Sequence, residues 1–155
     1  MGLYPTTDLA LRFDRDRIAA DLAIVDGDLA LDATPVTPMI VSLGTDRRAL
    51  ADDALPDAIS ALSAPAGWTL RRGWVGDCLA AAGRRIGSRL WLICREHQDE
   101  ATRRRAEDYV AEALGWATRD LGITPEIEVS WARTGILKIR ALIDGRAVTL
   151  SRKVV

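Results

Sequence analysis

Three alternating apolar runs near the C-terminal end of the sequence constrain the fold more than any other feature. Their apolar members are Ile127, Val129 and Trp131; Leu137, Ile139, Ala141 and Ile143; and Val148 and Leu150. A period of two places the members of each run on one face of a β-strand. Thr134-Gly135 and Asp144-Gly145 separate the runs, and Asp-Gly in this position is a strong hairpin signal because glycine accepts a positive φ without steric cost. We therefore predict consecutive antiparallel strands.

A long amphipathic helix is predicted before these strands, over about residues 99–121. Its apolar stripe contains Ala106, Tyr109, Val110, Ala113, Leu114, Ala117 and Leu121. Charged residues, among them Arg104, Asp108 and Glu112, fall on the opposite side. Asp99 is expected to cap the N-terminus, and Gly122 to end the helix.

The N-terminal part predicts further strands and a shorter helix. Leu9, Leu11 and Phe13 alternate with polar or small residues, and a second alternating stretch surrounds Asp26-Gly27. This pattern indicates a strand followed by a hairpin with one buried face. A short helix is expected over about residues 35–44, starting near a proline.

The order of these elements indicates an α+β fold formed by residues 1–155 as a single domain. The N-terminal and C-terminal strands are expected to form an antiparallel sheet packed against the long helix (about 99–121) and the shorter one (about 35–44). A long irregular region, about 44–77, lies between them. Loops of this length are usually functional or disordered, and Trp68 and Trp74 argue against disorder. Arg89 and Trp91 are predicted to be internal, because the run 90–93 is too apolar to face water.

Composition and motifs indicate no enzyme. The formal net charge of −1 gives no global field that would attract nucleic acid or a membrane. No apolar run approaches the roughly 20 residues that span a bilayer, and no secretory signal is expected. The cysteines, Cys78 and Cys94, lack metal-ligand spacing and are expected to be reduced, packed thiols of a protein made in the bacterial cytoplasm.

The individual residues that could carry chemistry also indicate no catalytic or binding site. His97 is the only histidine and lies in a charged stretch without a defined partner. No nucleophile elbow, phosphate-binding loop or dinucleotide motif is present. The three arginines 103–105 precede acidic residues and are typical of a solvated helix face. We predict no catalytic residue, cofactor, metal or small-molecule substrate.

Five segments in a fixed order resemble one known family. They are Ala20–Leu29, Val41–Asp53, Arg71–Asp77, Arg85–Leu92 and Arg104–Tyr109. In this order and spacing they resemble the Mu-like phage gene product 46 family, a baseplate wedge component related to the T-even phage wedge protein with the lysozyme-like name. The resemblance covers about residues 9–150. Val75 stands where a second tryptophan is expected, and residues 58–70 depart from the family pattern.

The resemblance implies a non-catalytic structural protein of a contractile tail. Such a protein joins baseplate wedges around the hub, and related proteins offer strand edges that help to initiate the sheath. The implied partners are other wedge and hub proteins, and also tube or sheath proteins. The implied location is the virion tail baseplate, assembled in the cytoplasm of the bacterial host.

Two sets of residues are candidate interfaces. The first is Arg71, Arg72, Gly73, Trp74, Gly76 and Asp77, because arginine and tryptophan are frequent interface residues. The alternative is that Trp74 fills this subunit's own core and that Arg72 pairs with Asp77. The second set lies at an exposed edge of the final strands, either residues 136–143 or residues 147–151. Its members are Ile136, Lys138, Arg140, Val148 and Leu150.

Other functions remain open on the sequence alone. A tailocin or another injection particle would use the same protein. A small regulatory adaptor that binds one soluble partner is the main alternative from a different class, because fold does not fix function. A hydrolase is suggested only by the historical naming of the family, and no catalytic pair supports it.

Overall fold

The computed structural model describes residues 8–14, 19–56, 70–79 and 84–154. Its strands are β1 (Asp8–Leu9), β2 (Leu11–Asp14), β3 (Ala19–Leu22), β4 (Ile24–Val25), β5 (Asp28–Leu29), β6 (Leu31–Asp32), β7 (Glu126–Arg133), β8 (Ile136–Ile143) and β9 (Arg146–Lys153). Its helices are α1 (Val36–Gly44), α2 (Glu100–Ala113) and the short turns η1 (Val75–Cys78), η3 (Arg89–Ile93) and η4 (Ala117–Leu121). Trp68 and most of the stretch 58–70 lie outside the described residues.

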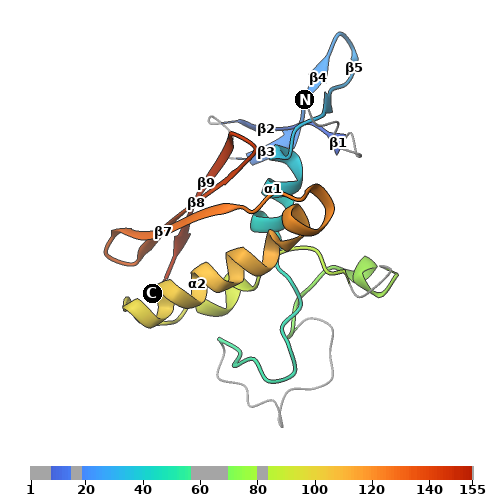
Figure 1. The fold of residues 1–155 in the computed structure, drawn as a ribbon. Helices are drawn as coiled ribbons and strands as arrows, with labels where there is room; N and C mark the ends of the chain where they lie inside the picture. Colours follow the sequence, from blue (N-terminus) through green and yellow to red (C-terminus); the bar gives the residue numbers. More distant parts are fainter. Residues whose placement is uncertain (1–7, 15–18, 57–69, 80–83, 155) are drawn as a thin grey trace.

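The C-terminal strands form an antiparallel sheet in the order β7-β8-β9, as predicted (Figure 1). Asp144 and Gly145 both have positive φ, of 48° and 71°, which is the geometry of the tight hairpin turn expected there. One face of β8 is apolar and fully buried. Its side chains are those of Leu137, Ile139, Ala141 and Ile143.

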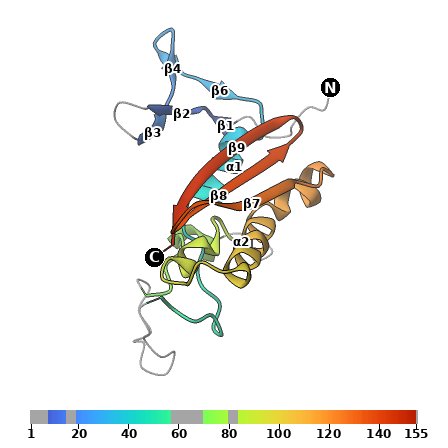
Figure 2. The same ribbon diagram turned by 90° about the vertical axis from the view of Figure 1, so that its left-hand side faces the viewer.

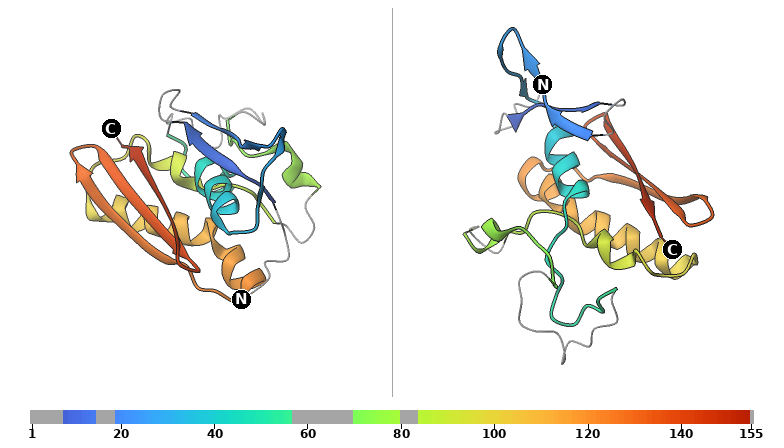
Figure 3. Two further views of the ribbon diagram at one scale, coloured as in Figure 1. Left: turned by 90° about the horizontal axis from the view of Figure 1, so that it is seen from above. Right: turned by 180° about the vertical axis from the view of Figure 1, so that it is seen from behind.

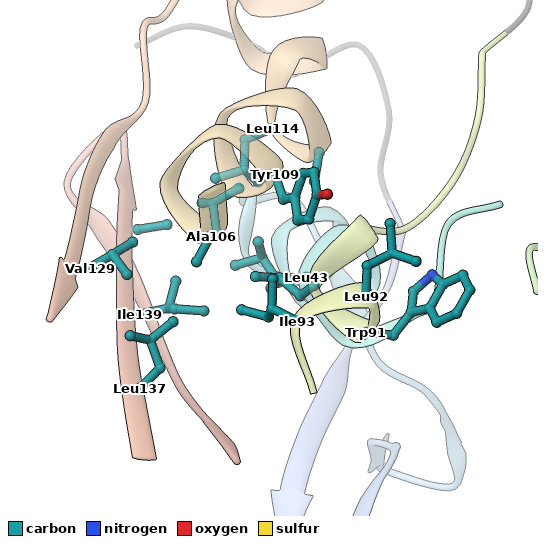
Figure 4. Packing of buried hydrophobic residues seen from close by; sticks show 14 of the residues in the cluster. Leu43, Trp91, Leu92, Ile93, Ala106, Tyr109, Leu114, Val129, Leu137 and Ile139 are labelled. Carbon is teal, nitrogen blue, oxygen red and sulfur yellow. The ribbon is translucent and has the colours of Figure 1, made fainter. Parts of the chain in front are cut away.

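The two main helices cover this face of the sheet. Met39 and Leu43 from α1 share one core with Ala106, Val110 and the buried face of β8. Figure 4 shows the side chains of the core between the sheet, α2 and η3. Figures 2 and 3 show α1 between the sheet and the N-terminal strands. The sheet therefore has one buried face and one open face, as an antiparallel sheet allows.

The long predicted helix is interrupted. Asp99 caps α2 as expected, because its Oδ1 accepts a hydrogen bond of 2.7 Å from the Thr102 N–H. However, α2 ends at Ala113, and after a short turn the chain continues as the π-helical turn η4. Gly115 lies at this break, and glycine is a poor helix former. Gly122 ends η4 in the left-handed conformation.

The N-terminal strands do not extend the C-terminal sheet, which corrects one detail of the prediction. They form three two-stranded ribbons, β1-β6, β2-β3 and β4-β5. The ribbons meet at three alanines linked in a ring of hydrogen bonds: the Ala10 N–H donates to Ala30 O (2.8 Å), that of Ala30 to Ala23 O (2.8 Å), and that of Ala23 to Ala10 O (2.9 Å). Strands of two to four residues that cross in this way offer no continuous edge for the eight-residue β9.

The α+β class is confirmed. The predicted hairpin at Asp26-Gly27 is also confirmed, since both residues have positive φ. Its expected buried face is wrong, because Leu22, Ile24, Leu29 and Leu31 are exposed. No helix among the described residues has the length and apolarity needed to cross a membrane.

Asp32 attaches the N-terminal ribbons to α1. Its Oδ2 accepts hydrogen bonds from the backbone N–H (3.2 Å) and the hydroxyl (3.0 Å) of Thr37 in the first turn of α1. The same hydroxyl lies 3.3 Å from the Leu11 N–H and accepts from it. Partial burial raises the pKa of Asp32, but hydrogen bonds from Thr34 and Thr37 outweigh burial and lower this pKa below its usual value.

Protonation of Asp32 is expected to loosen this attachment. Because the folded-state pKa of Asp32 lies below its unfolded value, its contribution is complete above the unfolded pKa and is lost as the pH falls through the folded pKa. Asp32→Asn should therefore shift the amide resonances of Ala10, Ala23 and Ala30 already at neutral pH. In the wild type the same resonances should shift only when the pH is lowered into the acid range. Asp28→Asn is the control. Unchanged spectra for Asp32→Asn would contradict this role.

Candidate assembly interface

The first part of the irregular region is fixed by backbone pairing to the segment before η3. Asp46 and Ser88 form an isolated parallel bridge. The Arg47 N–H donates to Ser88 O (2.9 Å), and the Ser88 N–H donates to Thr45 O (3.0 Å). Trp91 is buried, with 2 % of its surface exposed, and its Nε1–H donates to Arg47 O (2.8 Å). The predicted burial of Trp91 is confirmed.

Arg89 ties this region to α2. Its Nη1 lies 2.8 Å from Asp53 Oδ1, and its Nε lies 2.8 Å from Glu112 Oε2 on α2. The guanidinium also stacks on the Tyr109 ring, 4.6 Å from the centroid. Burial lowers the pKa of Arg89, but the two carboxylates outweigh burial and raise it. The prediction that Arg89 lies inside the subunit, beside the apolar run 90–93, agrees with its low side-chain exposure of 15 %. No signal in the sequence indicated the two carboxylates that the guanidinium joins.

Arg71 and Arg72 of the first candidate set bind within the subunit. The Arg71 guanidinium donates to the carbonyl oxygens of Leu50 and Ala51. Arg72 pairs with Asp46 at 2.6 Å and stacks over Trp91, 4.5 Å from the ring centroid. The alternative in which Arg72 pairs with Asp77 is therefore wrong. Both arginines hold residues 70–74 against the strand-like segment 46–51.

Trp74 follows these two arginines and points into solvent. Its side chain is 55 % exposed, so the alternative that it fills the core is wrong. Gly76 is required beneath it, because a Cβ there would lie 2.2 Å from the Trp74 ring. Gly73 has φ of 99°, and a Cβ would lie 2.6 Å from the Arg48 Cβ. Other large apolar side chains are exposed nearby in the sequence: Val75, Leu79 and Ile86. We call Trp74 and these three residues the Trp74 patch.

A hollow of about 230 Å³ adjoins the Trp74 patch. Arg48, Arg72, Trp74, Asp77, Cys78 and Arg85 are among its lining residues. Asp77 Oδ1 accepts a hydrogen bond from the Ile86 N–H (3.0 Å). Asp77 Oδ2 is buried and has no hydrogen-bond partner within the described segments. A buried carboxylate oxygen without a donor is costly, so a donor supplied from outside would be favourable here.

The second candidate set is divided between the middle and the edge of the sheet. Ile136, Lys138 and Arg140 lie on β8, which pairs on both sides and is not an edge. The prediction of an edge at residues 136–143 is therefore wrong. Val148 and Leu150 lie on the edge strand β9 and pack against the core. Lys138 and Arg140 point to the open face of the sheet and are exposed.

The side of β9 that faces away from β8 has backbone N–H groups available for hydrogen bonds. Ile143 and Arg146 flank a two-residue turn and form a hydrogen-bonded pair, so alternation directs the N–H groups of Thr149 and Ser151 away from β8. No backbone carbonyl of the described segments accepts from these two N–H groups. The opposite edge, β7, is partly covered, because Arg103 Nη1 donates to Val129 O (3.3 Å).

The arginines at the start of α2 have acidic partners. Arg103 pairs with Glu100 (2.7 Å) and Glu107 (2.9 Å), and Arg105 pairs with Glu96 (2.6 Å). Hydrogen bonds from Arg103 and then Arg104 lower the pKa of Glu100 to about 2. These are the contacts of a solvated helix face. Within the described part of the chain, no group of three or more His, Cys, Asp or Glu residues is arranged to hold a metal ion. Both cysteines are free, and Cys78 is exposed, so its predicted packing is wrong.

Removal of the Arg89 guanidinium is expected to break the link between Asp53 and Glu112 of α2. Arg89→Leu leaves Asp53 and Glu112 unpaired and should lower the free energy of unfolding by about 2 kcal/mol, less than the roughly 3–5 kcal/mol of a fully buried pair because Glu112 keeps access to water. Arg89→Lys should recover only part, since lysine lacks the fork that reaches both carboxylates. Urea unfolding measures both values. An Arg89→Leu variant as stable as wild type would contradict this role.

Comparisons with known proteins point to one family. The model of the family described as phage protein GP46 matches residues 35–149. A relative, the baseplate protein gp46 of Escherichia phage Mu, is 43% identical over 110 residues, which cover 71% of this chain and 67% of the Mu protein. No solved structure matches this chain. The chain therefore belongs to the phage GP46 family, and its relative in phage Mu is a baseplate protein.

Proposed function

We propose that this protein is a structural subunit of the baseplate wedge of a contractile phage tail. The observation that carries the proposal is membership of the GP46 family together with 43% identity to a Mu baseplate protein. The described residues support a role in assembly, since their most distinctive surfaces are exposed apolar side chains and an unpaired strand edge. The partners are other baseplate proteins, at the junction between the wedges and the hub.

The Trp74 patch is the proposed wedge contact. Arg71 and Arg72 hold the preceding segment in place, so that Trp74 is presented in a defined position. A rigid aromatic side chain loses little entropy on binding and buries a large area, which is typical of interface hot spots. A donor from the partner would also satisfy Asp77 Oδ2 beside it.

The free edge of β9 is the proposed contact with the sheath. An exposed strand edge favours pairing with a strand of another chain. Strand addition gives affinity through main-chain hydrogen bonds. We propose that a sheath strand pairs with β9 through the N–H groups of Thr149 and Ser151.

The central experiment is co-expression with the baseplate proteins encoded by neighbouring genes of the same phage. Size-exclusion chromatography and electron microscopy should show the protein in a defined wedge complex. A stable monomer that ignores these proteins would favour the adaptor function and overturn the baseplate proposal.

Trp74→Ala should weaken wedge assembly without destabilising the subunit. The side chain is exposed, so the melting temperature should stay within the small range of surface substitutions. Affinity for the wedge proteins should fall at least about tenfold, as for an interface hot spot. Trp91→Ala is the matched control: this buried tryptophan should cost about 3–5 kcal/mol of stability. A large fall in melting temperature for Trp74→Ala would contradict the assignment.

Thr149→Pro should block strand addition at β9. Proline removes the N–H group that points away from β8, and proline is tolerated at a sheet edge. Thr149→Val keeps this N–H group and is the matched control. Particles assembled with Thr149→Pro should have baseplates without extended sheath, seen by electron microscopy, whereas Thr149→Val particles should be normal. Full sheaths in both would exclude β9 as the sheath contact.

A further inference from the structure

An arm formed by residues 19–34 projects from the body of the protein beyond α1 (Figures 1 and 3). It contains β3 to β6, with the β4-β5 hairpin at its tip. The arm precedes the residues that match the GP46 family model, 35–149. Residues 20–29 of the arm are nevertheless the first of the five segments that resemble the family.

Burial on the arm is the reverse of that on an ordinary strand. Adjacent side chains of an extended chain point in opposite directions, so Ala23 and Ala30 point away from the large apolar residues next to them in the sequence. Ala23 is buried at the ribbon junction, whereas Ile24 is 68 % exposed and Leu31 is 69 % exposed. The exposed apolar residues of the arm are Leu22, Ile24, Val25, Leu29 and Leu31. A cluster of this kind marks an interaction surface.

The arm has a defined structure that holds this surface in place. Ile24 pairs with Leu29 across the hairpin, so their side chains lie on the same face. Asp26 and Gly27 form the tight turn, the alanine ring closes the base, and Asp32 joins the arm to α1. A surface ordered before binding loses less entropy in the complex.

The charge of the arm identifies the kind of partner. Residues 19–34 contain four aspartates and no basic residue, in a chain whose net charge is −1. Asp21, Asp26 and Asp28 are exposed around the apolar side chains. Pairing of two arms would bring these like charges together, which is unfavourable. A partner surface with lysine or arginine around an apolar cleft is complementary.

We propose that this arm docks into an apolar cleft rimmed by basic residues on another protein of the baseplate. This inference rests on the proposed function and names a contact separate from the Trp74 patch and the β9 edge. The apolar side chains supply the buried area, and the three exposed aspartates set the orientation and speed the encounter.

The test uses the full-length protein co-expressed with the baseplate proteins from neighbouring genes. Ile24→Thr/Leu29→Thr keeps good strand formers but removes the apolar surface, and binding should weaken at least about tenfold. Leu142→Thr, an apolar position on the open face of the sheet and outside the proposed contacts, is the matched control and should bind as wild type. Amide spectra of each free variant verify that the arm is intact.

A second pair of variants tests the charge. In Asp21→Asn/Asp28→Asn the amide oxygen can still accept the hydrogen bonds from Leu22 and Leu29, so only charge is lost. Binding should weaken and lose part of its salt dependence. Equal or tighter binding would overturn the basic partner.

The remaining outcomes are separable. A wedge complex that forms equally with wild type and with Ile24→Thr/Leu29→Thr would overturn the arm inference and leave the proposed function standing. If the wild type self-associates and these substitutions abolish the self-association, the arm binds a second copy of this chain. That outcome would also overturn the arm inference. Absence of any complex with the wild type would overturn the proposed function and this inference together.

Discussion

Burial of one face of β8 is the constraint on which the rest of the structure depends. Leu137, Ile139, Ala141 and Ile143 have at most 1 % of their surface exposed, and the side chains that cover them come from α1, α2 and η3. Burial of apolar surface is the main favourable term in folding. Because β8 pairs on both sides, its position also fixes β7 and β9, and with them the sheet edge that remains free.

A second level of order depends on arginines rather than on apolar packing. Arg89 joins Asp53 to Glu112, and Arg71 and Arg72 join residues 70–74 to the segment 46–51. These contacts give shape to a region with little regular secondary structure. As a consequence Trp74 has a defined, exposed position, which a flexible loop would not give it. The contacts of these three arginines thus connect the core of the subunit to its proposed wedge contact.

The free subunit exposes surfaces that an isolated soluble protein would normally bury. The arm, the Trp74 patch and the edge of β9 come from different parts of the chain and differ in chemistry: acidic and apolar, aromatic, and main-chain polar. A subunit with several distinct surfaces can bind several different neighbours at once. This arrangement suits a protein that joins parts of a larger assembly, and it requires no catalytic group.

The sequence by itself determined the local elements, because their signals are local. The alternation and Asp144-Gly145 predicted the C-terminal hairpin, Asp99 predicted the start of α2, and the ordered segments identified the family. Tertiary structure alone decided which strand lies at the edge, where α2 breaks, and which partner each arginine takes. Pairing order and long-range ion pairs depend on residues distant in the sequence, such as Arg72 with Asp46. Exposure of Ile24 and Trp74 was likewise undetermined, because an apolar residue has the same pattern whether its own core or a partner covers it.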